Sequence, residues 1–395
     1  MKIVHIVLSA GADYTDGWSY QENTLPVLQK ELGHDISLIS STTSSLVKDD
    51  RSTVQGEYIV NGVKVIRIKP TFQLLENRIA WFGDLYKVLE RENPDLLFLH
   101  GTNFCSLGQV AKYKKNNPQK VVFFDSHVTY ENSMNRFRFI NKHFIHKGLW
   151  RYINQRYISI FSKGYYVAPQ VKKYLVEMYG INPNLLFHLP MGTNVPDELV
   201  NKKQLIRTTW RKANNINEND FVLVTGGRFR EQKKLFELLS AFKSVEMSSI
   251  RLVVFGKFEN EEYKKKIESL ISSDDRVKFL GWLNNEETLK VYLSCDLAVF
   301  SGSQSVIWRT AIACGLPIIC NYSDGAEEMD FNGNLVFVNN DDLEEWKNAI
   351  QSVAESIEKY QEMRRVTEEL AKPFFTEKRV AQMIIHDYET IKKQM

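Results

Sequence analysis

Short runs of consecutive apolar residues recur along the chain, and most are followed by a stretch with the spacing of an amphipathic helix. The first half contains "KIVHIVLS", "PDLLFLHG" and "KVVFFDSH", and the second contains "FVLVTGG", "IRLVVFG" and "CDLAVFS". Strands that are apolar on both faces are typical of parallel sheets covered by helices on both sides. The pattern therefore predicts an α/β protein with doubly wound sheets.

With 395 residues, the chain is too long for one ordinary hydrophobic core, so we expect two domains. A polar stretch over residues 196–218 separates the two series of strands and is predicted to be the linker. The predicted domains are residues 1–195 and 196–374, with a final helix at about 375–395 that packs back on the first domain.

Two local predictions concern the first domain. Residues 57–69 alternate around Asn61-Gly62, a type I′ turn signal, which predicts a β-hairpin at a sheet edge. A helix is expected over residues 75–92.

The chain shows neither a spanning apolar segment nor a signal-peptide pattern, so the sequence predicts a cytoplasmic protein. Its four cysteines lack paired spacing and nearby histidines, which indicates reduced thiols rather than disulfides or a zinc site. The chain also lacks an Asp-x-Asp pair, the usual sequence sign of a metal-held diphosphate. We therefore expect neither an essential metal nor a cofactor.

Residues 132–176 contain nine Lys and Arg residues and no carboxylate. Within them, "NRFRFINKHFIHKGLWRYINQRYISIF" interleaves basic and aromatic residues, a composition typical of a helix at an anionic lipid surface. The alternative is a core-facing helix with solvated cations. Nucleic acid is a poor fit because the stretch carries no recognisable binding module. The residues predicted to face a membrane or acceptor are Arg136, Arg138, Lys142, Lys147, Trp150 and Arg151.

Loops that follow strands are the expected ligand sites of an open α/β domain. After the strand "FVLVTGG", Gly226 and Gly227 allow a tight exit, while Arg228 and Lys233 could hold the oxygens of a diphosphate. The alternative is a solvated basic loop. The loop after the first strand contains Gly17, which could let backbone amides approach a ligand.

Histidines end two of the apolar strands of the first domain. His127 follows Asp125 in "VVFFDSHVTYENS" and could donate to a sugar hydroxyl or merely cap the strand. His100 closes another strand, and its role stays open.

Several segments together resemble a known family. "GGRFREQKKLFELLSAF" and "CDLAVFSGSQSVIWRTAIACGLPIICN" are similar to the donor domain of retaining GT-B glycosyltransferases of family 4, and "DSHVTYENS" and "HLPMGTNV" are similar to the acceptor domain. The resemblance implies two Rossmann-like domains that face each other across a cleft. The first would be the acceptor and membrane-facing domain, and the second would bind the nucleotide-sugar donor.

The resemblance also implies roles for particular residues. Arg228 and Lys233 match a basic pair that grips the donor diphosphate, Gly17 a glycine beside the phosphates, and His127 a histidine that contacts the transferred sugar. Further donor-binding residues would lie in the glycine turn and around the start of the helix "IWRTAIACG", where backbone amides meet a phosphate. They are Gly227, Ser303, Gln304, Ser305, Val306 and Thr310.

The sequence departs from this family at two positions. The family carries two glutamates, one facing the donor sugar and one the nucleotide ribose, where this chain has Gly302 and Thr310. Thr310 could still hydrogen-bond a ribose hydroxyl, whereas Gly302 offers no side chain.

The resemblance implies a hexosyltransferase-type enzyme that moves a sugar with retention from a nucleotide-sugar donor to a lipid-linked or growing surface glycan, such as capsule or O-antigen. It would work in the cytoplasm, peripherally on the inner face of the cell membrane. The alternative is a non-catalytic GT-B-fold partner or stabiliser of an active glycosyltransferase. A dinucleotide oxidoreductase is disfavoured because no Gly-x-Gly-x-x-Gly follows a predicted strand.

Overall fold

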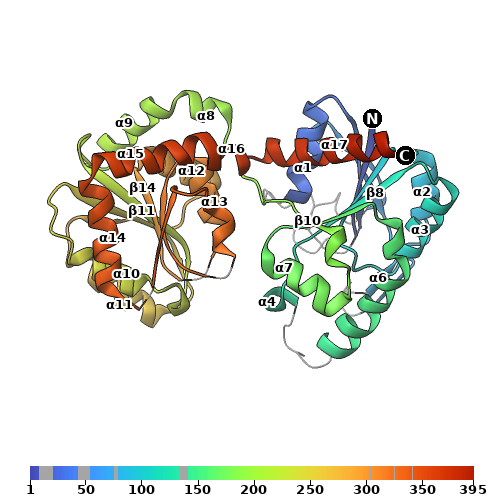
Figure 1. Cartoon of the computed structure of the whole chain (residues 1–395), viewed down its shortest axis with the longest axis horizontal. Helices are drawn as coiled ribbons and strands as arrows, with labels where there is room; N and C mark the ends of the chain where they lie inside the picture. Colours follow the sequence, from blue (N-terminus) through green and yellow to red (C-terminus); the bar gives the residue numbers. More distant parts are fainter. Residues whose placement is uncertain are drawn as a thin grey trace. The chain divides into compact units, whose positions relative to one another are not determined.

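The computed structural model describes residues 1–8, 21–42, 54–74, 79–133, 141–302, 304–323, 325–339 and 341–395. The chain forms two compact units. The first consists of Met1–Met191 with Glu377–Met395, and the second of Gly192–Thr376. Each unit has a largely parallel sheet with helices around it, which confirms the predicted α/β architecture (Figure 1).

The first unit contains an eight-stranded sheet in the order β10-β9-β8-β7-β1-β2-β4-β3. Its strands are β1 (Lys2–Val7), β2 (Asp35–Ser41), β3 (Gly56–Val60), β4 (Val63–Ile68), β7 (Leu96–His100), β8 (Val121–Ser126), β9 (Lys163–Tyr166) and β10 (Leu186–His188). Neighbouring strands are parallel except for β3 and β4. Asn61 and Gly62 join these two with φ angles of 49° and 76°, so the predicted hairpin is confirmed.

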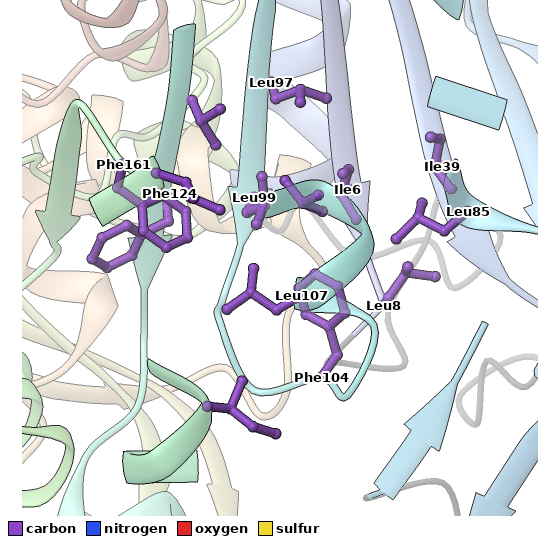
Figure 2. Packing of buried hydrophobic residues seen from close by; sticks show 14 of the residues in the cluster. Ile6, Leu8, Ile39, Leu85, Leu97, Leu99, Phe104, Leu107, Phe124 and Phe161 are labelled. Atoms are coloured by element: carbon purple, nitrogen blue, oxygen red, sulfur yellow. The ribbon is translucent and has the colours of Figure 1, made fainter. Parts of the chain in front are cut away.

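Both faces of this sheet are apolar because alternate residues of each strand point to opposite sides. One face carries Ile6, Leu97 and Leu99, against which Leu107 packs (Figure 2). The helices that cover the two faces contribute buried residues to separate clusters. The first face is covered by α2 (Leu85–Glu92), α3 (Leu107–Asn116), α6 (Arg151–Tyr157) and α7 (Pro169–Tyr174), and the second by α1 (Gln21–Glu31) and α17 (Glu377–Gln394).

The last helix, α17, belongs to the first unit and lies beside α1 (Figure 1). Its Asp387 accepts a hydrogen bond from Tyr165 at 2.7 Å and pairs with Lys163 at 2.7 Å, both on β9. Burial of Val380 and Ile384 against the sheet adds the apolar part of this contact.

The second unit contains a six-stranded parallel sheet in the order β13-β12-β11-β14-β15-β16. Its strands are β11 (Phe221–Phe229), β12 (Ile250–Phe258), β13 (Val277–Phe279), β14 (Leu297–Phe300), β15 (Ile318–Asn321) and β16 (Leu335–Val338). The helices around it are α8 (Asp197–Asn201), α9 (Lys203–Ala213), α10 (Leu235–Lys243), α11 (Glu261–Ile271), α12 (Asn285–Ser294), α13 (Val306–Ala313), α14 (Leu343–Glu355), α15 (Ile357–Val366) and α16 (Lys372–Phe374).

Two predictions of local structure are wrong. The stretch 196–218 is not a linker, because it forms α8 and α9, and buried Arg211 ties α9 to Asp296 at 2.7 Å. The helix expected over 75–92 begins only at Leu85; the antiparallel pair β5 (Phe72–Leu74) and β6 (Ile79–Trp81) precedes it. Aromatic residues in β5 and β6 favour strands, which the helical spacing concealed.

Candidate functional site

Three glycines lie where β11 and β12 pair near their carboxyl ends in the second unit. Gly227 pairs in register with Gly256, and a Cβ added at Gly256 would lie 2.0 Å from the Gly227 carbonyl oxygen. A Cβ at Gly226 would lie 2.4 Å from the ring of Phe255. A side chain at any of these glycines would meet a neighbouring atom, so packing alone accounts for the two glycines near the end of β11.

The cations that follow these glycines differ in their partners. Arg230 forms two hydrogen bonds with Glu259 at 2.5 and 2.9 Å, and Lys234 pairs with Asp341 at 3.0 Å. Arg228 is exposed and makes no ion pair or hydrogen bond with any described residue. The charge of Arg228 acts on nearby Glu259, but its guanidinium N–H groups, at the end of a central strand, are not used in a direct contact with the described residues and can bind an anionic ligand.

The turn that carries Lys233 packs directly against the loop after β14. The Ser301 hydroxyl donates to the Lys233 carbonyl oxygen at 2.7 Å. Gly302 has a φ of +75°, and a Cβ added to it would lie 2.5 Å from the Cα of Lys233. The backbone of this turn therefore occupies the space that a side chain at Gly302 would need.

Helix α13 begins beside the end of β11. A Cβ at Gly227 would lie 3.2 Å from Ile307 in the first turn of the helix. Ser305, the residue before the helix, is extended and its side chain makes no capping hydrogen bond. Gln304 instead directs its amide to the Met329 sulfur at 3.7 Å, and Val306 is exposed. The amide groups at this helix start favour a negative charge.

A buried ion pair that the sequence analysis missed supports α13. Arg309, 2% exposed, contacts Glu328, and the two lie on α13 and on the segment after β15. An Arg inside the apolar run "IWRTAIACG" is the sequence signal for it, since a buried Arg requires a partner. Thr310 accepts or donates a hydrogen bond with Thr193 at 3.3 Å, so its hydroxyl already has a partner within the second unit.

The structure thus brings Gly227, Arg228, Lys233 and the start of α13 into one region of the second unit. Gln304, Ser305, Val306 and Thr310 lie along the same loop and helix. Gly17 and Ser303 lie outside the described residues.

In the first unit, His127 follows β8 and its side chain is 30% exposed. Its Nε2 lies 3.7 Å from Asp125 Oδ2, and Asp125 is wholly buried. The same Asp125 oxygen lies 3.0 Å from Nδ1 of His100, the residue whose role the sequence left open.

The pKa values in this group are shifted in opposite directions. Burial alone would lower the pKa of His127, but hydrogen bonding to Asp125 and the charges of Glu22 and Asp125 raise it to about 9. Burial would raise the pKa of Asp125, yet the neighbouring His100 and His127 hold it below its usual range. His127 is therefore the cationic partner and Asp125 the anionic one.

The predicted membrane face lies on helix η1 (Asn141–Trp150) and α6. Lys147 is exposed, Lys142 is partly exposed, and Phe144 and Tyr152 are among the most exposed aromatic residues. Arg136 and Arg138 lie outside the described residues.

Two predicted members of this face have other contacts. Trp150 is wrong as a surface residue: it is 3% exposed and packs in the apolar core, because its large apolar ring gains more from burial than from exposure. Arg151 donates to the carbonyl oxygens of Glu177 and Met178 at 3.2 and 3.4 Å, at the end of a neighbouring helix.

Among the residues that the structure describes, we find no group of three or more His, Cys, Asp or Glu side chains arranged to hold a metal ion. Within the same residues, no helix combines the length and apolar character needed to cross a bilayer.

Comparison with known proteins identifies both units. Residues 25–195 match the family described as Glycosyltransferase Family 4, and residues 206–369 match Glycosyl transferases group 1. These domains indicate a GT-B glycosyltransferase of the GT4-like kind. The GT-B chain is also 24% identical over 147 residues to the uncharacterized glycosyltransferase MJ1607 of Methanocaldococcus jannaschii, a match that spans 35% of the chain and 38% of that relative.

Solved structures share the fold of the GT-B chain at low identity. The HepE protein of Anabaena, solved in complex with UDP, has a TM-score of 0.65 and 16% identity, with 99% of this chain and 100% of that chain covered. The sucrose-phosphate synthase of Thermosynechococcus elongatus has a TM-score of 0.61 and 15% identity, with both chains fully covered. These similarities confirm the predicted GT-B fold.

Proposed function

We propose that the protein transfers a hexosyl unit, with retention of configuration, from a nucleotide-sugar donor to a lipid-linked or growing surface glycan. The observation that carries the proposal is Arg228, an exposed guanidinium that forms no ion pair or hydrogen bond with a described residue and follows Gly227, which lies beside the uncapped start of α13. HepE, which has the same fold, was solved with UDP and with UDP-glucose, and this supports a nucleotide-sugar donor here.

The proposed chemistry rests on stabilising the leaving nucleoside diphosphate. Arg228 and Lys233 would neutralise charge that develops as the sugar departs, and the amides of the α13 start would bind the phosphate oxygens. Because fixed cations and amides supply this stabilisation, we propose that no metal ion is needed.

The acceptor is proposed to meet the first unit. Lys142 and Lys147 with exposed Phe144 and Tyr152 form a basic and aromatic surface, which suits peripheral docking on the cytoplasmic face of a membrane that carries the lipid-linked acceptor.

A second candidate function is a non-catalytic GT-B partner of an active transferase. Gly302 and Thr310 favour it: the first has no room for the family's sugar-facing carboxylate, and the hydroxyl of the second is held by Thr193.

A panel of UDP, GDP, ADP and CMP sugars separates the two functions. Mass spectrometry of the products with and without lipid-linked glycans should show transfer or slow hydrolysis of at least one sugar. Binding of a nucleotide sugar without any turnover would favour the non-catalytic partner, and no binding at all would refute both the donor site and the transferase.

A further inference from the structure

A row of titratable side chains crosses one buried face of the first sheet. His5, His100 and Asp125 lie on the neighbouring strands β1, β7 and β8 and are 0%, 4% and 0% exposed. The rest of that face is apolar, with Ile3, Phe98 and Phe123 among its members. Burying three such groups is unfavourable unless each is hydrogen-bonded, so their partners must account for their presence.

The three side chains form one continuous chain of hydrogen bonds that begins on α1. Gln29 Oε1 lies 2.8 Å from His5 Nε2, and His5 Nδ1 lies 3.0 Å from His100 Nε2. His100 Nδ1 then lies 3.0 Å from Asp125 Oδ2. Every ring nitrogen of His5 and His100 is thus used within the chain.

Hydrogen-bond directions restrict how this chain can be protonated. If the Gln29 oxygen accepts from His5 Nε2–H, His5 Nδ1 accepts from His100 Nε2–H. If the Gln29 amide is turned, its NH2 donates to His5, and each neutral histidine passes the donation on. The pKa of Asp125 is held below its usual range, so Asp125 is ionised and accepts from His100 Nδ1–H.

We propose that Gln29, His5 and His100 act as positioning residues that hold Asp125 as an oriented carboxylate, so that His127 meets its ligand as a protonated imidazole. His127 lies at the exposed end of the series, 3.7 Å from the Asp125 oxygen. A protonated imidazole donates from both nitrogens, so one N–H can face Asp125 while the other faces an oxygen of the nucleotide-sugar donor. Only this last step rests on the proposed function.

The surrounding charges favour the same state. Glu22 on α1 adds a negative charge that acts on His127. Asp387 does not shift the pKa of His127; it accepts from the hydroxyl of buried Tyr165 on β9, which is paired in register with Asp125. Burial and the neighbouring His100 lower the pKa of His5 to about 3, so His5 stays neutral and passes hydrogen bonds without adding charge.

The test is a histidine titration followed by NMR on the whole chain with labelled histidine, with the His127 signal assigned from His127→Gln. We expect the wild-type midpoint at about 9. Asp125→Asn should lower it to about 6.5 or below, the range of an unpaired histidine. Asp387→Asn is the matched control: it removes a carboxylate near the same face and should leave the midpoint unchanged.

His100 provides two further variants. His100→Asn keeps a donor at the position of Nδ1 and should retain the raised midpoint, whereas His100→Leu removes that donor and should lower it. Circular dichroism checks that each variant is folded. A wild-type midpoint near 6.5, or an unchanged midpoint in Asp125→Asn, would overturn the proposal even if one of the His100 variants does not fold.

Measuring nucleotide-sugar affinity at two pH values separates this proposal from the proposed function. If His127 must be protonated to bind, Asp125→Asn should weaken nucleotide-sugar binding about 20-fold more at pH 8 than at pH 6. This factor is the fraction of His127 that is protonated at pH 6 divided by the fraction at pH 8, for a pKa of about 6.5 in the variant. Failure of every variant and of the wild type to bind a nucleotide sugar, with the titration as expected, would refute the proposed function and leave the positioning chain intact. Equal weakening at both pH values would refute the role of protonation in binding.

Discussion

At the scale of single residues, Gly302 shows how backbone packing decides what the site can contain. Its φ of +75° is a conformation that side chains disfavour, and its missing Cβ leaves room for the backbone of Gln232 and Lys233. The family's sugar-facing glutamate cannot be placed here without moving the turn that carries Lys233. In the proposed reaction, the donor sugar is therefore recognised without that carboxylate.

We predict that Gly302→Ala destabilises the second unit more than Gly281→Ala. Gly281 has a φ of +74° but no atom within 4 Å of an added Cβ. Gly281→Ala should therefore lose only the about 1–2 kcal/mol that a side chain costs in the left-handed backbone conformation. Gly302→Ala should add about 1–3 kcal/mol of overpacking. Denaturant unfolding followed by tryptophan fluorescence measures the difference. Equal destabilisation by the two variants would show that the turn that carries Lys233 can move to make room for the added methyl group.

The variant Gly302→Glu, which introduces the family's residue, should be folded poorly and should not raise transfer activity. A stable Gly302→Glu with faster turnover would contradict this account of the site.

Some site residues were accessible from sequence and others were not. Arg228 was predicted because a basic residue after a glycine-ended strand is a local pattern. The chain from Gln29 to Asp125 joins residues far apart in sequence: the sequence placed His100 and Asp125 at the ends of apolar strands but did not indicate that they meet or that Gln29 and His5 join them. Arg309 and Glu328 are likewise paired by packing and not by spacing.

At the scale of secondary-structure elements, apolar strands were recognised more reliably than polar helices. Residues 196–218 look like a linker in the sequence because α9 is strongly polar. The helix is held by ion pairs of Arg207 and Arg211 with Asp296, which the composition does not reveal. Helix η1 gave the opposite error for Trp150: aromatic residues recur along it, but Phe144 is exposed whereas Trp150 is buried. Periodicity predicts that an element exists, whereas its partners decide which side is buried.

For the basic stretch of residues 132–176, which includes this helix, we predict reversible binding to anionic vesicles. Replacing Arg136, Arg138, Lys142 and Lys147 by Gln should weaken binding to vesicles that contain phosphatidylglycerol, with a contribution on the order of 1 kcal/mol for each residue at the surface. Sedimentation with vesicles measures it. The control replaces four exposed lysines on other elements by Gln: Lys87, Lys115, Lys265 and Lys393. Equal loss in both sets would indicate a general charge effect, and no loss would refute the docking surface.

At the scale of the whole molecule, the chain returns to its first unit at Glu377, the first residue of α17. Glu377 is 4% exposed, and burial raises its pKa to about 7 despite a hydrogen bond with Thr24. Between about pH 4.5 and 7 the carboxyl group is protonated in the folded state and ionised in the unfolded state. The free energy of unfolding therefore falls as the pH rises through this range.

We therefore predict that Glu377→Gln stabilises the first unit at pH 8 by about 2–3 kcal/mol and has almost no effect at pH 4, because Gln mimics the neutral carboxyl group. Unfolding curves at both pH values test it, with Glu389→Gln on the exposed side of the same helix as the control. A Glu377→Gln effect that does not change with pH would show that the carboxyl group is not neutral in the folded state.

The most direct test of the account is calorimetry of nucleotide-sugar binding to the wild type, Arg228→Ala and Arg230→Ala. The two arginines lie two residues apart, but only Arg230 is paired, with Glu259. We predict that Arg228→Ala weakens binding of the preferred donor at least about 10-fold, the loss of one charge-assisted contact, while Arg230→Ala leaves it nearly unchanged. Equal affinity of the wild type and Arg228→Ala would contradict the central claim that Arg228 holds the donor diphosphate.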